Sequence, residues 1–213
     1  IEVLDRAFVE AGYEPIESYE FKEKKLVACH YEHPETQGPK IFISALLLDE
    51  CSAGLRDTVA GLIDQVPKGL EADWRFPVCG RRWELDHSVY LSLLEESAYA
   101  AWLAAFGFRA NHFTVAVHKL TSVDSLAALN EILVSEGFAL NESGGVIKGS
   151  PEAGLQQSST LAESIPVQFG DGTFDIPSCY YEFAYRHRMA SGELFEGFIA
   201  DSATHLFEST NVK

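Results

Sequence analysis

The sequence predicts an α+β fold built from two β-α-β-β-β modules, the first of which lacks its opening strand in this chain. The first observation is a repeat: "RAFVEAGYEP" (6–15) and "EILVSEGFAL" (131–140) each read as the end of an amphipathic helix followed by Gly and an aromatic residue. Gly12 and Gly137 suit the left-handed conformation that ends a helix. The repeat therefore predicts one helix near the start of each half.

The second observation is that similar strand patterns follow both glycines. The runs after Gly12 are "IESYEF", "KLVACHYEH" and "KIFISALLL". The runs after Gly137 are "GGVIKGS", "LQQSSTLA" and "SCYYEFAYR", with a hairpin expected near "FGDGTFDI". Each half is therefore predicted to be a helix followed by three strands.

The third observation is a strand before the second helix. In "NHFTVAVHKL" (111–120) apolar residues alternate with His112, Thr114, Ala116 and His118, as expected for a strand with two different faces. A helix is predicted over 121–137, with Thr121 or Ser122 as its cap. Its apolar stripe consists of Val123, Leu126, Leu129 and Leu133.

We expect one domain over residues 1–213, organised in three parts. Residues 1–66 form the incomplete first module, residues 67–107 a connecting helical segment, and residues 108–213 the second module with a C-terminal segment. Extra helices are predicted over 52–67 and 86–107. The strands of the two modules are expected to form a curled mixed sheet around a metal cavity.

Composition excludes several classes of protein. The formal net charge of −16 repels phosphate backbones, which argues against a nucleic-acid partner. No apolar run is long enough to span a membrane, and no export signal is visible, so a cytoplasmic location is expected. The cysteines at 29, 51, 79 and 179 are therefore predicted to be reduced thiols.

His112 and Glu182 are the candidate metal ligands. They lie on the first and last strands of the second module, and these outer strands can pair when the sheet curls. A second His would complete the 2-His-1-carboxylate set of non-haem Fe(II) oxygenases. Structural alternatives remain open: His112 as an ordinary hydrogen-bonded core residue, and Glu182 as a solvent-facing residue or one paired with Arg186 or Arg109.

Other histidines are weaker candidates. Cys29, His30 and His33 in "CHYEH" would suit zinc but lack a matching second pair of ligands, and the two histidines are expected to be solvated. His118 lies far along the strand from His112 and is interpreted as structural.

The repeat also predicts the place of the missing ligand. His112 precedes Gly137 by 25 positions (137 − 112), and the same offset before Gly12 falls about thirteen residues upstream of Ile1. We therefore expect the third ligand, a His, upstream of this chain.

Four long segments resemble the 2-oxoadipate dioxygenase/decarboxylase (hydroxyglutarate synthase) family, which belongs to the vicinal-oxygen-chelate superfamily. They are "GFRANHFTVAVHKLTSVDSLAALNE", "GGVIKGSPEAGLQQSSTLAE", "IPSCYYEFAYR" and "GELFEGFIADSATHLFEST". The resemblance is dense from Phe108 onward and looser before Trp83, and the compact length is similar to that of the family's short bacterial members.

The resemblance implies an Fe(II) enzyme that converts a 2-oxo acid, 2-oxoadipate, and O2 to 2-hydroxyglutarate and CO2. His112 matches the family's second His and Glu182 its carboxylate, whereas the first His and a carboxylate-binding Arg match no residue here. Asp201 and Ser202 in "ADSA" match a segment that helps to hold a substrate carboxylate, although Ser202 also suits a helix cap, and Ser159 is expected to line the cavity. The alternatives are another metalloenzyme of the superfamily, such as an isomerase or lyase, and a metal-free binding module.

Overall fold

The computed structural model describes residues 1–36, 38–199 and 207–210. Their contacts divide the chain into two compact units, Ile1–Ala110 with Pro166–Ile176, and Asn111–Ile165 with Pro177–Lys213. Helices and short antiparallel or mixed sheets occur in both units, which confirms the α+β class. The second unit begins close to the position where the repeat places the second module.

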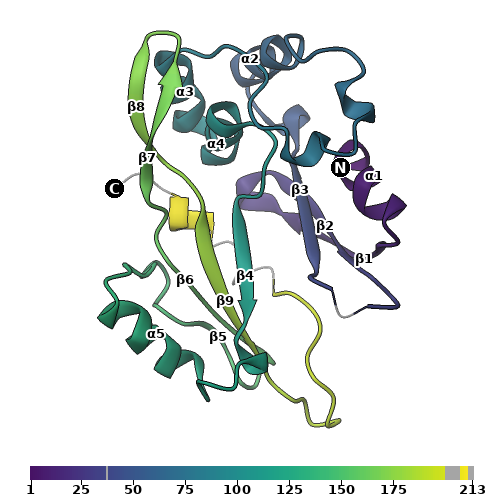
Figure 1. Cartoon of the computed structure of the whole chain (residues 1–213). Coiled ribbons are helices and arrows are strands. Elements are labelled where there is room, and N and C mark those ends of the chain that lie inside the picture. The colour runs from purple at the N-terminus through teal and green to yellow at the C-terminus, as the bar shows by residue number, and fades with distance from the viewer. Residues whose placement is uncertain (37, 200–206, 211–213) are drawn as a thin grey trace. The chain divides into compact units, whose positions relative to one another are not determined.

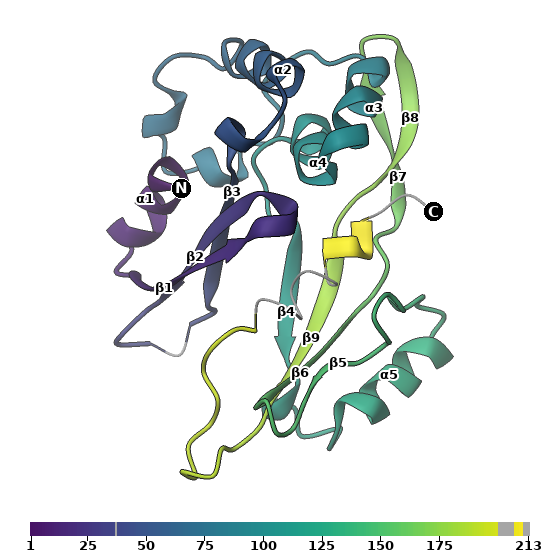
Figure 2. The same cartoon turned by 180° about the vertical axis from the view of Figure 1, so that it is seen from behind.

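The first unit contains the predicted helix and three strands. Helix α1 (Glu2–Glu10) precedes β1 (Glu14–Phe21), β2 (Leu26–Glu32) and β3 (Ile41–Leu46), which form an antiparallel sheet in the order β1-β2-β3 (Figure 2). Leu4 and Phe8 of α1 pack against a buried cluster of Cys29, Tyr31 and Ile43. The amphipathic helix therefore covers one face of this sheet.

Residues 52–107 contain three α-helices where the sequence predicts two. Helix α2 (Ala53–Ile63) agrees with expectation, but the long predicted helix is divided into α3 (His87–Glu96) and α4 (Ala98–Phe106). Ser97 lies between them in an extended conformation, and its hydroxyl accepts a hydrogen bond from the Ala100 amide. The helix breaks here because a serine side chain caps a new helix better than it continues the old one.

A glycine ends α4 for a steric reason. Gly107 has φ 73° and ψ −156°, a conformation that is essentially limited to glycine. A Cβ at this position would lie 2.2 Å from the backbone nitrogen of Arg81. The approach is this close because Gly80 and Phe108 exchange backbone hydrogen bonds of 2.8 and 3.3 Å.

The hairpin predicted near "FGDGTFDI" is confirmed and supports the start of α3. Strands β7 (Ser164–Phe169) and β8 (Gly172–Pro177) pair as a two-stranded sheet joined by a two-residue turn. In this turn Asp171 Oδ1 accepts a hydrogen bond of 2.7 Å from the His87 amide, whereas Asp86, the N-cap residue of α3, makes no side-chain cap bond. A residue from the hairpin thus supplies the cap that the helix lacks.

His30 is buried, and the expectation that it is solvated is wrong. Only 1% of its surface is exposed, and its ring bonds to the Tyr19 hydroxyl (Nδ1, 2.9 Å) and to Glu32 Oε1 (Nε2, 3.1 Å). Burial lowers the pKa of His30 below its ordinary value of 6.5, against the raising effect of Glu32. The neighbouring Cys29 is a free thiol in the buried cluster under α1, so nothing in this segment forms a zinc site among the residues that the structure describes.

The second unit has the predicted β-α-β-β-β order. Strand β4 (His112–Ala116) is followed by helix α5 (Leu126–Ser135), then by β5 (Lys148–Ser150), β6 (Leu155–Ser159) and β9 (Tyr180–Arg186). The sheet order is β4-β9-β6-β5, with β4 and β9 parallel and the other pairs antiparallel (Figure 1). The expected pairing of the first and last strands is therefore confirmed.

Two details of this module differ from expectation. Helix α5 begins at Leu126, where the Ser125 hydroxyl accepts a hydrogen bond from the Ala128 amide, so neither Thr121 nor Ser122 is the cap. In addition, the described strands form three separate sheets. A single curled sheet that encloses a cavity is therefore not confirmed.

The apolar stripe of α5 covers one face of the four-stranded sheet. Val117, Leu126 and Phe183 form a buried cluster, and Val123, Leu129 and Leu133 pack around it. These helix positions are the predicted stripe, except that Val123 lies just before the helix begins. Because side chains alternate along a strand, the opposite face of β9 carries Tyr180, Glu182, Ala184 and Arg186.

Short 3₁₀ turns connect several elements: Lys22–Lys24, Leu48–Glu50, Leu70–Ala72, Phe76–Val78, Val117–Lys119 and Phe207–Thr210. All four cysteines are free thiols, as the sequence predicts. Within the part of the chain that the structure describes, no helix combines the length and apolar character needed to cross a membrane.

The same substitution at two glycines should have opposite effects on stability. We expect Gly107→Ala to lower the free energy of unfolding by at least about 1–3 kcal/mol, because the new methyl group meets backbone and the conformation is strained. Gly61→Ala in α2 should raise it by about 0.5–1 kcal/mol, because no atom lies within 4 Å of the added Cβ. Urea unfolding of both variants measures these changes, and equal effects would contradict the steric account.

The lowered pKa of His30 should make stability depend on pH. As the pH falls through 6.5 the unfolded chain takes up a proton that the folded protein still excludes, so stability is fully present above this pH and declines below it. We expect the wild type to lose more stability between about pH 7.5 and about pH 5.5 than His30→Gln, which keeps polar groups but does not titrate. The pKa of His118 is also lowered, but His118 is present in both proteins, so its contribution to the pH dependence cancels in the comparison. Equal losses in urea unfolding would disprove the role of His30.

Candidate metal site

The pairing of β4 with β9 brings His112 and Glu182 together. In the parallel register His112 lies opposite Tyr180 and Thr114 opposite Glu182, so all four side chains share one face of the sheet. His112 Nε2 lies 3.4 Å from Glu182 Oε2. The two residues singled out from the sequence thus converge at the polar face, opposite the face that α5 covers.

The Glu182 carboxylate is buried and is held by an amide. Its side chain is 7% exposed, compared with 24% for His112. Gln157 of β6, itself 3% exposed, donates from Nε2 to Glu182 Oε1 over 2.5 Å. Within the described residues, the partners of Glu182 are Gln157 and His112, so the alternative of an ion pair with Arg109 or Arg186 is not realised.

The other ring nitrogen of His112 has its own partner. Nδ1 lies 3.2 Å from Asn111 Oδ1, so the tautomer with its proton on Nδ1 would donate to Asn111 and leave Nε2 able to bind a metal. The ring also stacks on Tyr180, with centroids 4.7 Å apart and an interplanar angle of 15°. These two contacts orient the imidazole, and such contacts are usual for a metal-bound histidine.

Two buried polar atoms beside this pair have no hydrogen-bond partner among the residues that the structure describes. They are Gln157 Oε1 and the Tyr180 hydroxyl. Burial raises the pKa of Tyr180, and the neighbouring Glu182 and Cys179 raise it further, so the phenol is protonated and able to donate a hydrogen bond. Unsatisfied buried polar atoms are uncommon and gather at sites that bind something.

The donor set fits a divalent metal such as Fe(II). An imidazole nitrogen and a carboxylate oxygen converge, and these groups match two of the three ligands of a 2-His-1-carboxylate site. The part of the chain that the structure describes holds no group of three or more His, Cys, Asp or Glu side chains placed to bind one metal ion. The third ligand, expected upstream of Ile1, stays a prediction.

The remaining predicted site residues are only partly described. Ser159 lies opposite Glu182 in the β6–β9 register, is fully buried, and shares a 2.8 Å hydrogen bond with the Ser209 hydroxyl. Asp201 and Ser202 lie outside the described residues. His118 accepts a hydrogen bond of 3.4 Å from the Arg186 amide, consistent with the structural role expected for it.

Sequence reasoning missed three residues that contact the pair. Tyr180 shares the face of Glu182 in the strand alternation, and Asn111 directly precedes His112, so both positions were open to prediction. The contact of Gln157 with Glu182 could not be predicted from the sequence, because it depends on the register between β6 and β9.

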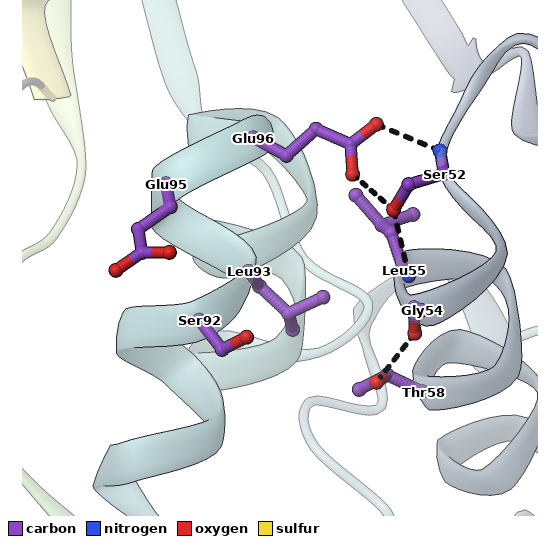
Figure 3. Close-up of a pocket in the computed structure, with 8 residues that line it drawn as sticks. All are labelled: Ser52, Gly54, Leu55, Thr58, Ser92, Leu93, Glu95 and Glu96. Atoms are coloured by element: carbon purple, nitrogen blue, oxygen red, sulfur yellow. Dashed lines mark hydrogen bonds between the residues drawn. The ribbon is translucent and has the colours of Figure 1, made fainter.

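A separate pocket in the first unit carries no comparable chemistry. It has a volume of about 250 Å³ and lies between the start of α2 and the end of α3 (Figure 3). One of its two carboxylates, Glu96, already accepts hydrogen bonds from the Ser52 amide (2.9 Å) and hydroxyl (2.5 Å), as Figure 3 shows, and the other is Glu95. Glu96 thus supports the start of α2.

Comparison with known proteins gives a consistent family. The family model of 2-oxoadipate dioxygenase/decarboxylase matches residues 80–193. A chloroplastic 2-oxoadipate dioxygenase/decarboxylase of Arabidopsis thaliana is 36% identical over 99% of this chain. The chain covers 64% of that relative's length.

Two solved structures are similar over nearly the whole chain. The hydroxyglutarate synthase of Oryza sativa, in complex with 2-oxoadipate, has a TM-score of 0.92 at 34% identity, covering 99% of this chain and 75% of the rice chain. A protein of Shewanella frigidimarina described as a candidate hydrolase has a TM-score of 0.90 at 48% identity, covering 94% of this chain and 79% of its own. From the family match and the identity over the full chain, we conclude that this chain belongs to the 2-oxoadipate dioxygenase/decarboxylase family.

Proposed function

We propose that the protein is an Fe(II)-dependent enzyme that converts 2-oxoadipate and O2 to 2-hydroxyglutarate and CO2. The observation that carries this proposal is the convergence of His112 Nε2 and Glu182 Oε2, 3.4 Å apart on a buried polar sheet face. Family membership supports the reaction class. The rice relative with bound 2-oxoadipate supports a small 2-oxo acid as substrate.

The proposed reaction balances without a further reductant. The bond between the 2-oxo carbon and its carboxylate breaks and releases CO2. One oxygen atom of O2 enters the new carboxylate of the shortened acid, and the other enters its hydroxyl group. The 2-oxo acid itself supplies the electrons, so no separate 2-oxo acid is consumed.

Each residue of the site has a physical task in this scheme. Asn111 holds the proton on Nδ1 of His112, so that Nε2 is available as a neutral ligand. Glu182 brings a negative charge that offsets part of the charge of the ion, and its burial limits access of water. When bound, Fe(II) supplies chelation of the 2-oxo acid and activation of O2.

The Tyr180 hydroxyl provides a donor for substrate recognition. It is protonated and buried, and it has no partner within the described part of the chain, so an acceptor oxygen of a bound acid would satisfy it. Asp201, Ser202 and Ser159 stay predicted substrate-binding residues. The cytoplasmic location and the absence of a nucleic-acid partner also stay predictions, and the Arabidopsis relative is chloroplastic.

Oxygen consumption separates this proposal from the other functions. A different metalloenzyme of the superfamily, such as an isomerase or lyase, would turn over its substrate without consuming O2. A metal-free binding module would hold the 2-oxo acid without bound metal. Either of these results, measured on the protein as its gene encodes it, would refute the proposal.

Glu182→Gln tests the charge of the carboxylate at constant size. We expect metal occupancy and O2-dependent CO2 release from 2-oxoadipate to fall at least about 100-fold. The fold should survive, because an amide is less costly to bury than an unpaired carboxylate. Glu163→Gln, at an exposed position of the same unit, is the control. Melting temperature, metal content and CO2 release are measured on one sample. Turnover equal to that of the wild type would refute the assignment of Glu182 as a metal ligand.

His112→Phe tests the nitrogen ligand while keeping an aromatic ring against Tyr180. Metal binding and turnover should fall at least about 100-fold, with a melting temperature close to that of the wild type. The matched control is His187→Phe, because His187 contacts Gln156 and Tyr185 instead of the site. If His112→Phe retains bound metal, His112 is a structural residue.

A further inference from the structure

We propose that Gln157 is a positioning residue that restricts Glu182 to binding the metal through one oxygen, Oε2. The inference rests on the proposed function and deepens it. Gln157 lies opposite Ala184 in the register of β6 with β9. This pair is two positions along the strands from the pair of Ser159 with Glu182, so both pairs lie on the same face of the sheet. Its side chain therefore reaches along the sheet face to the carboxylate.

The hydrogen bond from Gln157 gives the two carboxylate oxygens of Glu182 different surroundings. An amide NH2 group only donates and a carboxylate oxygen accepts, so the 2.5 Å contact from Gln157 Nε2 engages Oε1 of Glu182. The other oxygen, Oε2, is left toward His112 Nε2 at 3.4 Å. A metal that took both oxygens would have to compete with the amide for Oε1.

This division matters for the number of positions left to the reactants. If an upstream His completes a 2-His-1-carboxylate set, that set would leave open positions for the 2-oxo acid and O2. A Glu182 that ligates through one oxygen would leave more of these positions than a Glu182 that ligates through both. Holding Oε1 with an amide would therefore keep room for both reactants.

The unpartnered carbonyl of Gln157 argues against a purely structural role. Gln157 Oε1 is buried and has no hydrogen-bond partner among the described residues, which is a cost to stability. A methionine has nearly the same shape and would fill the same space without an unsatisfied oxygen. A polar side chain at this position is therefore explained by what its NH2 group does to Glu182.

The test compares Gln157→Met with Gln156→Met in the protein as its gene encodes it. Gln156 is the adjacent residue of β6, and its side chain lies on the opposite face, where Oε1 contacts His187 Nε2 at 3.0 Å. Co(II), whose visible spectrum reports coordination number, serves as the probe. We expect Gln157→Met to raise the Kd for Co(II) by about 10- to 100-fold and to change the spectrum. Gln156→Met should keep the wild-type Kd and spectrum.

A second variant, Gln157→Asn, keeps an amide but is one methylene shorter, so it should lose contact with Oε1 and weaken Co(II) binding in the same way. Adding 2-oxoadipate should change the Co(II) spectrum of the wild type more than that of either Gln157 variant. A folded Gln157→Met or Gln157→Asn with the wild-type Kd and spectrum would overturn the inference. A wild type that binds no Co(II) would instead overturn the proposed function, and the positioning role with it.

Discussion

The burial of one carboxylate, that of Glu182, is the constraint on which the second unit depends. Moving a carboxylate out of water costs several kcal/mol even after the protein relaxes. Here Gln157 donates to one carboxylate oxygen, and the other oxygen lies 3.4 Å from His112 Nε2, on a strand whose opposite face packs against α5. The amide offsets only part of the cost of burying the charge. Under the proposed function, a bound cation would offset more of it.

The parallel pairing of β4 with β9 makes this arrangement possible. Parallel neighbours need a long crossover, and here the chain passes through α5, β5, β6 and the β7–β8 hairpin before it returns beside β4. As a result, His112 at the start of β4 lies beside Tyr180 of β9, two residues before Glu182. A shift of one residue in this register would turn one of the two side chains toward α5, so the site and the apolar cluster require the same register.

The first unit uses buried polar groups differently. The ring of His30 bonds at both nitrogens, to Tyr19 and to Glu32, and Glu32 in turn accepts from Lys40 Nζ over 2.5 Å. The ring is thus held within a network of side chains on its own sheet. In the second unit, by contrast, Gln157 Oε1, the Tyr180 hydroxyl and Asn130 Nδ2 have no partner among the described residues, and the first two lie beside Glu182. This difference is the physical basis for placing the binding chemistry beside Glu182.

The sequence by itself determined most of the local structure. Alternation and helical periodicity predicted β9, β4 and the strands after Gly12, because these patterns follow from side-chain direction along the backbone. The same patterns singled out His112 and Glu182, because a polar side chain on a strand rich in aromatic residues is expected to be buried and to need a polar partner. Helix boundaries were less certain: Ser97 and Ser125 act as caps, and a serine caps or continues a helix according to what the neighbouring segment packs against.

Only the tertiary structure decided the contacts between strands distant in the sequence. The amide of Gln157 on Glu182 and the burial of His30 both depend on register, and neither follows from a local pattern. The division of the strands into separate sheets, instead of one curled sheet, is of the same kind. The physical reason is that side-chain periodicity specifies which face a residue occupies, whereas strand pairing and packing specify which residues meet on that face.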